Sequence, residues 1–171
     1  GMIHQHFKLV DVFTAAENIV LGLKDEKGFA MKEYTKKIKQ ISELYGFDID
    51  PDKKIYEMSV SEKQTVEIVK ALFRGADILI LDEPTAALDP IAEADMYSKY
   101  NAMAEGRSSV YISHRLASTR FCDRIILLDG SVIAEEGTHD ELMALGGKYK
   151  EFFDVQSKYY KDGGKENEEE N

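Results

Sequence analysis

Apolar and polar positions along the 171 residues follow two periods, one typical of strands and one typical of helices. Residues 78–81 are continuously apolar, as in a strand buried inside a parallel sheet, and 108–112 have the composition of a second buried strand. Residues 124–128 and 132–136 flank Asp129-Gly130, a pair that favours a two-residue hairpin turn. The pattern therefore predicts parallel strands together with a hairpin.

Helices are predicted where apolar residues recur every three or four positions after a capping pair. Such pairs, a Ser or Thr followed three positions later by Glu, are Thr14 with Glu17, Ser59 with Glu62, and Thr138 with Glu141. Further helices are expected over 31–45, from Pro90 to 104, and over 148–160. Strands and helices together predict an α/β chain.

Composition limits the possible functions. The formal net charge of -10 argues against a basic surface for nucleic acid, and no apolar run approaches the roughly 20 residues that cross a bilayer. Cys122 is the single cysteine, which excludes a disulfide framework and favours a buried, unreactive thiol. Glutamates crowd the end of the chain, so we expect 162–171 to form an acidic, disordered tail.

Two adjacent carboxylates, Asp82 and Glu83, follow the first apolar run and precede Pro84. Ligands of open α/β sheets collect beyond the carboxyl ends of the strands. Successive strand side chains point opposite ways, so one acid could hold a cation while the other faces a water molecule. That division suits Mg²⁺-dependent nucleotide hydrolysis. An ordinary strand that ends in a solvated acidic turn is the alternative, and the run alone would favour it.

Longer motifs around these acids favour the first interpretation. Residues 82–90 resemble the Walker B motif and D-loop of ABC-type ATPases, Gly1 to His6 resemble their Q-loop, and 112–115 resemble their switch-histidine loop. The segment 58–64 stands at the place of the signature motif, usually Leu-Ser-Gly-Gly-Gln. It is a divergent copy, in which Ser61 and Glu62 replace a glycine and a glutamine.

The resemblance implies a P-loop NTPase-like ABC ATPase core with an α-helical signature subdomain. No Gly-x-x-x-x-Gly-Lys-Ser/Thr pattern occurs among the 171 residues, so the core is expected without its first strands and phosphate loop. We expect 1–161 to be the later part of a nucleotide-binding domain. About 8–75 would form the helical subdomain and 76–161 the remainder of the catalytic core.

The resemblance also implies roles for the residues of the ATP site, with ATP and Mg²⁺ as its ligands. Asp82 would bind Mg²⁺, and Gln5 would sense the metal and the γ-phosphate while linking the two subdomains. Glu83 would act as the base or water-positioning residue. His114 would contact the γ-phosphate and orient the attacking water. His4 and His139 are expected to be structural.

A second set of residues is implied to act across a dimer of ATPase domains. Asp89 would cross the dimer interface. Free N–H groups and the positive dipole end at the start of the signature helix would form an anion site for the partner's nucleotide. The residues of this site would be Ser59, Val60, Ser61 and Glu62. The implied partners are a second ABC ATPase domain and a transmembrane permease subunit, with the chain at the inner face of the cell membrane.

Two parts of the chain resemble different branches of the family. Residues up to about Ala76 look like sugar or nucleoside importers, whereas residues after Asp89 look like exporters. The importer-like segments are 4–7, 16–22 and 59–64, and the exporter-like segments are 112–119, 136–142 and 147–149. Our hypothesis is a mosaic, formed by recombination or by a sequence-assembly join across the shared Walker B and D-loop stretch.

The expected function is Mg-ATP binding and hydrolysis coupled to transmembrane transport, although the isolated chain is not expected to hydrolyse ATP. One alternative is a truncated or mosaic partner without catalysis, which offers only its signature face to an intact ATPase. A soluble ABC-type ATPase of DNA repair or translation is a further alternative, and a nonfunctional fragment is another.

Overall fold

The computed structural model describes residues 1–4, 7–23, 31–85, 88 and 90–162. The chain forms two compact units, Gly1–Ile112 and Ser113–Asn171, and each is described by itself. The expected tail, 162–171, lies outside the described residues apart from Asp162, which ends the last helix.

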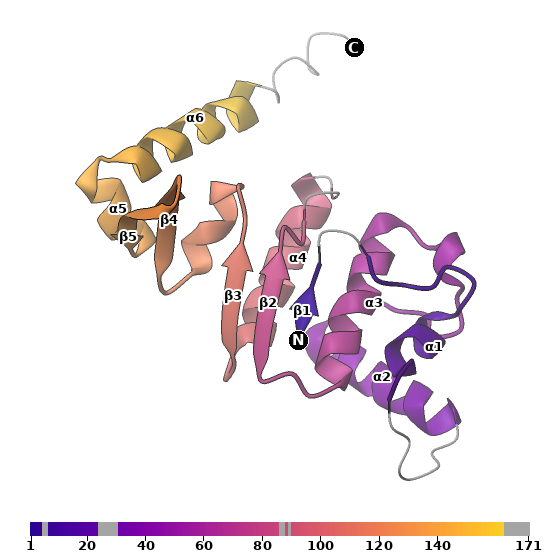
Figure 1. Cartoon of the computed structure of the whole chain (residues 1–171). Coiled ribbons are helices and arrows are strands. Elements are labelled where there is room, and N and C mark those ends of the chain that lie inside the picture. The colour runs from indigo at the N-terminus through magenta and orange to yellow at the C-terminus, as the bar shows by residue number, and fades with distance from the viewer. Residues whose placement is uncertain (5–6, 24–30, 86–87, 89, 163–171) are drawn as a thin grey trace, which may run out of the picture. The chain divides into compact units, whose positions relative to one another are not determined.

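The first unit is built on a parallel sheet of strands in the order β1-β2-β3. These strands are β1 (Met2–Ile3), β2 (Ile78–Asp82) and β3 (Ser108–Ile112). Along β2 and β3 the register runs from Ile78 opposite Ser108 to Asp82 opposite Ile112. Because the strands are parallel, their carboxyl ends lie at the same edge, the upper edge in Figure 1.

Helices make up most of the rest of the first unit. They are α1 (Ala15–Val20), α2 (Met31–Tyr45), α3 (Val60–Phe73) and α4 (Pro90–Ala104), with a short 3₁₀ helix over Ile55–Glu57. The capping pairs predicted at Thr14 and Ser59 are both present. In each pair the hydroxyl accepts the backbone N–H of the Glu, and the Glu carboxylate accepts the backbone N–H of the capping residue. Gly46 and Gly75 follow α2 and α3 with φ values of 70° and 69°. Only glycine adopts this left-handed backbone without a steric cost, and this ends both helices.

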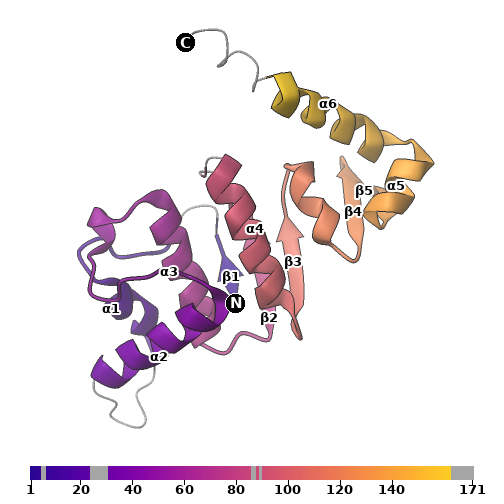
Figure 2. The ribbon, with the colours of Figure 1, turned by 180° about the vertical axis from the view of Figure 1, so that it is seen from behind.

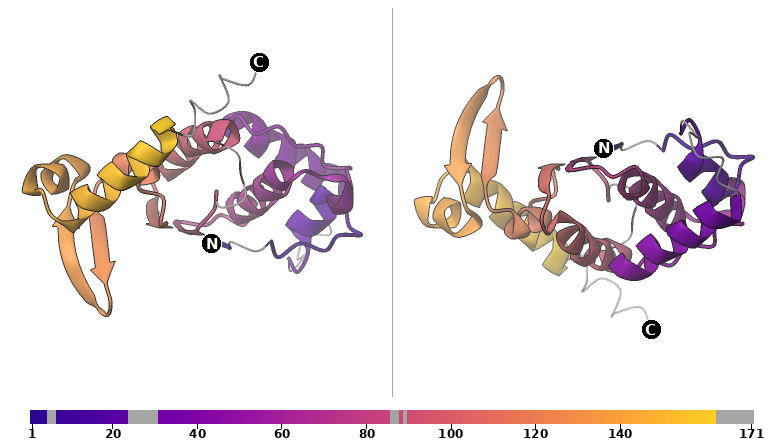
Figure 3. Two further views of the ribbon diagram at one scale, coloured as in Figure 1. Left: turned by 90° about the horizontal axis from the view of Figure 1, so that it is seen from above. Right: turned by 90° about the horizontal axis from the view of Figure 1, so that it is seen from below.

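Both α3 and α4 lie on one face of this sheet, as the view from behind and the views along the strands show (Figures 2 and 3). Burial follows from this one-sided cover: Leu79 and Leu81 are 1% and 2% exposed, whereas Ile78 is 56% exposed. Val110 and Ile112 on β3 are also exposed. The prediction of two fully buried strands was therefore wrong, because alternate side chains face opposite sides and only one side is covered by helices of this unit.

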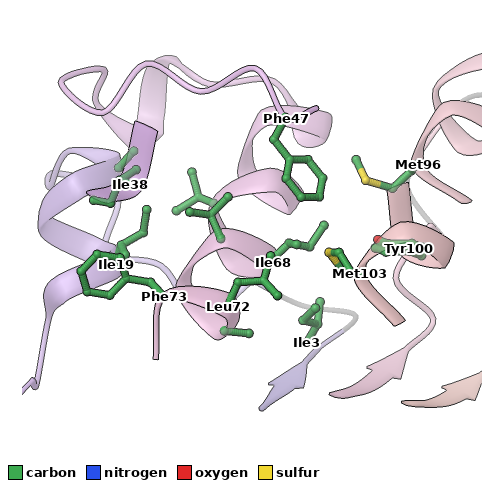
Figure 4. Packing of buried hydrophobic residues seen from close by; sticks show 14 of the residues in the cluster. Ile3, Ile19, Ile38, Phe47, Ile68, Leu72, Phe73, Met96, Tyr100 and Met103 are labelled. Carbon is green, nitrogen blue, oxygen red and sulfur yellow. The ribbon is translucent and has the colours of Figure 1, made fainter. Parts of the chain in front are cut away.

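The core of the first unit joins its helices to its sheet. Figure 4 shows Ile19 of α1, Ile38 of α2 and Ile68 of α3 pointing toward shared apolar space, with Met103 of α4 close to Ile3 of β1. These five side chains are at most 2% exposed. This apolar cluster therefore packs the helices of the first unit against its sheet, and Asp82 is the last residue of the middle strand of that sheet.

In its described residues, 113–162, the second unit contains an antiparallel hairpin and three helical segments. Its elements are a 3₁₀ helix over Leu116–Phe121, β4 (Ile125–Asp129), β5 (Val132–Gly137), α5 (His139–Leu145) and α6 (Lys148–Asp162). The structure confirms the predicted hairpin, with an irregular register between Leu127 and Leu128. Its two loop residues are Gly130 and Ser131 instead of Asp129 and Gly130, because Asp129 still pairs with Val132. The predicted capping pair of Thr138 and Glu141 is also confirmed.

Candidate functional site

The predicted acids lie together at the carboxyl end of the middle strand. Asp82 is the last residue of β2, and the backbone N–H of Glu83 donates to the Ile112 carbonyl of β3 at 2.9 Å. Both acids are partly exposed. Glu83 has a φ of +44°, a left-handed conformation that is unusual for a residue other than glycine.

The geometry at Glu83 differs from the one expected for a regular strand. Strand alternation was expected to divide the two acids between a cation and a water molecule. β2 ends at Asp82, so the direction of the Glu83 side chain is set by its left-handed backbone and not by the alternation of a strand. Two neighbouring, partly exposed carboxylates still fit Mg²⁺, which is commonly held by one or two carboxylates together with substrate phosphates. Asp82 is the residue of the strand that would hold it.

The signature-like segment forms the start of α3. The Ser59 Oγ accepts the Glu62 N–H at 3.2 Å, and the Glu62 Oε2 accepts the Ser59 N–H at 2.7 Å. The Lys53 Nζ donates to the other Glu62 oxygen at 2.6 Å. The hydrogen bond from Lys53, followed by that from the Ser59 N–H, holds the pKa of Glu62 below its ordinary value. The Glu62 carboxylate thus already serves one N–H group of the expected anion site.

A shallow hollow of about 360 Å³ borders this helix start. Ser59, Ser61 and Glu62 line it, whereas Val60 is not part of its lining. The other residues around it come from the segment before α3, from α3 itself and from α4: Asp48, Asp50, Lys53, Thr65, Met96 and Lys99. Because α3 runs antiparallel to β2 in Figure 1, the helix start and the carboxyl end of β2 lie at the same end of the first unit.

Gln5 and Asp89 lie outside the described residues. The backbone that follows Gln5 is held by two buried polar side chains that the sequence argument missed. The Glu67 Oε1 of α3 accepts the Lys8 N–H at 2.6 Å, and Asn18 of α1 bonds to both polar groups of Val10. Asn18 is fully buried together with Ala15, Ala16 and Ile19 of the same short helix, and its place among these apolar positions was the available signal.

His114 lies in the second unit, and its side chain is exposed. Its carbonyl accepts a hydrogen bond from the Gln156 side chain at 2.6 Å, and the Gln156 Oε1 accepts the Leu116 N–H at 2.9 Å. Gln156 of α6 therefore fixes the backbone around His114. The structure thus brings Asp82 and Glu83 together and groups Ser59 with Glu62, all within the first unit, while His114 belongs to the other unit.

His139 and Cys122 both pack against the apolar core of the second unit. The His139 Nδ1 is 2.8 Å from the hydroxyl of the fully buried Tyr149, and its ring packs on Phe153 with centroids 5.0 Å apart. Cys122 is half-buried, and burial raises the pKa of its thiol, which disfavours the reactive thiolate.

No group of three or more His, Cys, Asp and Glu side chains in the described ranges is arranged around a common metal position. Within those same ranges, no helix has both the length and the apolar character required to span a bilayer.

Sequence comparisons match this chain to ATP-binding proteins of transporters. The model of the ABC transporter family matches residues 1–86. The nucleoside import ATP-binding protein NupA of Lactococcus lactis subsp. cremoris is 48% identical over 132 residues, which are 75% of this chain and 26% of that protein. The leptomycin B resistance protein pmd1 of Schizosaccharomyces pombe is 42% identical over 144 residues, which are 81% of this chain and 10% of that protein.

A structural comparison gives the same result for the fold. A bacterial Atm1-family ABC exporter, solved with ATP bound, superposes with a TM-score of 0.69 and 30% sequence identity, covering 92% of this chain and 28% of the exporter chain. The chain spans about a quarter of the length of its nucleoside importer relative. Relatives therefore include both importers and exporters, as the two halves of the sequence predicted. On these matches the chain belongs to the ABC transporter family and has the fold of its ATPase domain.

Proposed function

We propose that this chain is part of the ATPase of an ABC transporter, which couples the binding and hydrolysis of Mg-ATP to transport. It supplies the two acids for hydrolysis, Asp82 and Glu83, and a signature face, the surface formed by the signature-like segment 58–64. The observation that supports this most directly is the pair Asp82 and Glu83 at the carboxyl end of β2. Phosphoryl transfer is catalysed mainly by positioning and by charge stabilisation, so acids held at a fixed sheet edge suit it.

Each residue of the site has a distinct task in this proposal. Asp82, together with Gln5, holds Mg²⁺, which when bound neutralises charge on the phosphates. Glu83 accepts a hydrogen bond from the attacking water and orients it or takes its proton. His114 contacts the γ-phosphate. The fixed turn at Glu83 and the Gln156 bonds around His114 support this division, because both groups stand on anchored backbone.

The signature face serves the nucleotide of a second ATPase domain. Ser59, Val60, Ser61 and Glu62 are the proposed contacts, and Asp89 crosses the interface. Residues 8–75 form the helical subdomain that meets a transmembrane permease subunit, which places the chain at the inner face of the membrane, while 76–161 complete the catalytic core. The charge of -10 leaves nucleic acid outside the proposed set of partners.

A second candidate function is that of a non-catalytic partner that offers only its signature face. One observation supports it: the start of α3 is capped, and Ser59 and Ser61 line a hollow beside it. In both candidates the 171-residue chain by itself does not turn over ATP. Robust Mg²⁺-dependent hydrolysis by this chain, abolished by Glu83→Gln, would contradict that shared expectation.

A mixing experiment distinguishes the candidates. The chain is added to a separate polypeptide spanning the first strands and phosphate loop of a nucleoside importer relative, and ATP hydrolysis is measured for the wild type, Glu83→Gln and Ser59→Arg. The catalytic proposal expects turnover that Glu83→Gln abolishes.

The chain is then added to a complete ABC ATPase domain with and without Mg-ATP. The non-catalytic candidate expects ATP-dependent association that Ser59→Arg weakens and Glu83→Gln leaves unchanged. If turnover in the first mixture is indifferent to Glu83→Gln, the catalytic proposal is wrong.

A further inference from the structure

A buried polar cluster joins the segment just after Glu83 to α4, and it has no role in the proposed function. Thr85, Glu93 and Tyr97 form it, with exposed fractions of 1%, 7% and 7%. The Thr85 hydroxyl donates to the Glu93 Oε1 at 2.8 Å, and the Tyr97 hydroxyl donates to the same oxygen. The two hydroxyl oxygens are 2.9 Å apart. Two donors from different segments thus converge on one carboxylate oxygen of α4.

The cluster is connected to Glu83 by a short and stiff piece of backbone. Only Pro84 separates Glu83 from Thr85, and the proline ring fixes its own φ near −65°. The Thr85 carbonyl also accepts the Leu88 N–H at 3.0 Å. Anchoring the Thr85 side chain therefore restricts the position and orientation of Glu83.

Glu83 requires such an anchor. A residue other than glycine is strained at a φ of +44° and keeps this conformation only where its surroundings determine it. One determinant is the hydrogen bond from the Glu83 N–H to Ile112 on β3. The buried cluster on α4 is a second one, on the other side of Pro84.

We propose that Glu93 and Tyr97 are positioning residues for Glu83, and that they act through the Thr85 hydroxyl. The catalytic task of Glu83 rests on the proposed function, but the positioning itself does not and can be measured without ATP. α4 is in turn tied to α3, because the Gln64 Nε2 donates to the Tyr100 hydroxyl at 3.2 Å. Both α3, which starts with the signature-like segment, and Thr85, which follows Glu83, are thus hydrogen-bonded to α4.

The neighbouring Tyr111 offers a matched control. Its ring lies 6.0 Å from that of Tyr97, centroid to centroid, and its buried hydroxyl lies beside the Thr85 and Tyr97 hydroxyls without a hydrogen bond of good geometry to any described residue. Tyr97→Phe and Tyr111→Phe remove the same atom from adjacent aromatic rings. Only the first removes a hydrogen bond to Glu93.

The test is amide hydrogen exchange of the 171-residue chain, read at the Glu83 N–H. Thr85→Val, Glu93→Leu and Tyr97→Phe are expected to accelerate exchange at Glu83 by about tenfold or more, beyond the change in the interior of α3, because each removes a buried hydrogen bond. Thr85→Ser and Glu93→Gln retain a hydroxyl and an acceptor oxygen, and both are expected to restore slow exchange. Tyr111→Phe is expected to leave it unchanged.

Met103→Val, a core change in α4 away from the cluster, controls for general destabilisation. The proposal is overturned if Thr85→Val and Tyr97→Phe accelerate the Glu83 amide no more than Met103→Val does at an equal loss of stability. It is also overturned if Thr85→Ser behaves like Thr85→Val. Should Glu93→Leu fail to fold, Tyr97→Phe tests the same link by removing a single oxygen. A failure of the mixing experiment, by contrast, would leave these exchange rates as expected.

Discussion

The side-chain amide of Asn18 holds both backbone polar groups of Val10. Its Oδ1 accepts the Val10 N–H at 2.7 Å, and its Nδ2 donates to the Val10 carbonyl at 3.1 Å and to the Thr14 carbonyl at 3.0 Å. Asn18 is fully buried. One side chain of α1 therefore satisfies the backbone of the segment that leads into the helical part of the first unit.

Asn18→Ala should strongly destabilise the chain. Each buried group left without its partner costs about 1–3 kcal/mol, so a loss of about 2–4 kcal/mol in the free energy of unfolding is expected. The measurement is urea unfolding. Asn101→Ala is the control, because Asn101 is exposed on α4 and its removal should change stability by less than about 0.5 kcal/mol. Equal losses for the two variants would refute the role given to Asn18.

The ion pair at the start of α3 predicts a pH dependence of stability. Hydrogen bonds from Lys53 and from the Ser59 N–H lower the pKa of Glu62 below 4.5 in the folded chain. A lowered folded pKa means that this contribution is present above the unfolded pKa and is lost as the pH falls through the folded value. The side chain is 38% exposed, so the effect is screened and small.

Two variants isolate this effect. Glu62→Gln removes the titrating carboxylate, so the free energy of unfolding should fall less steeply as the pH drops below 4.5, the ordinary pKa of Glu. The measurement is the free energy of unfolding from pH 6 to pH 3. Lys53→Met should weaken this pH dependence in part, because the Ser59 N–H still bonds to the carboxylate. An unchanged slope in both variants would show that the pair makes no contribution to folding.

Local features could be predicted from the sequence because their partners lie a few residues apart. The capping box of Ser59 with Glu62 and the hairpin that turns at Gly130 depend only on residue types within one turn. Burial of β2 could not be predicted in the same way. Ile78 and Leu79 are equally apolar, and only the helices packed on one face of the sheet separate them into exposed and buried positions.

The same limit applies to the site. Asp82 and Glu83 were found from their motif, but Thr85, Glu93 and Tyr97 were not, because their contacts join a turn to the next helix. The pattern places Glu93 in the first turn of a helix, where an acid is ordinarily a favourable solvated charge. Tertiary packing turns it into a buried acceptor.

Glu135 and Gly147 predict a reversal in the sign of a substitution. The Glu135 carboxylate accepts the Lys148 and Tyr149 N–H groups at the start of α6, at 2.5 and 3.0 Å. A Cβ on Gly147 would overlap the Glu135 carboxylate, so Gly147→Ala must displace this cap. We expect a loss of about 1 kcal/mol, typical of a lost helix cap.

In the Glu135→Ala background the obstruction is absent. Gly147→Ala should then be neutral or stabilise the chain by up to about 1 kcal/mol, because alanine restricts the unfolded chain more than glycine does. Thermal or urea unfolding of the four variants of this double-mutant cycle measures the coupling. Additive effects in the cycle would show that the two residues do not interact in this way.

The left-handed backbone of Glu83 predicts a difference in stability between two substitutions at this position. Asn adopts positive φ values more readily than longer side chains do, because its short amide bonds to the local backbone. Glu83→Asn should therefore be more stable than Glu83→Gln by about 0.5–1 kcal/mol, although both remove the carboxylate. Urea unfolding compares the two, and Asp82→Asn relative to Asp82→Gln, on a residue of regular strand, is the matched control that should not favour Asn. If Glu83→Asn and Glu83→Gln are equally stable, the backbone at Glu83 is not strained, and the need for the Thr85 anchor falls with it.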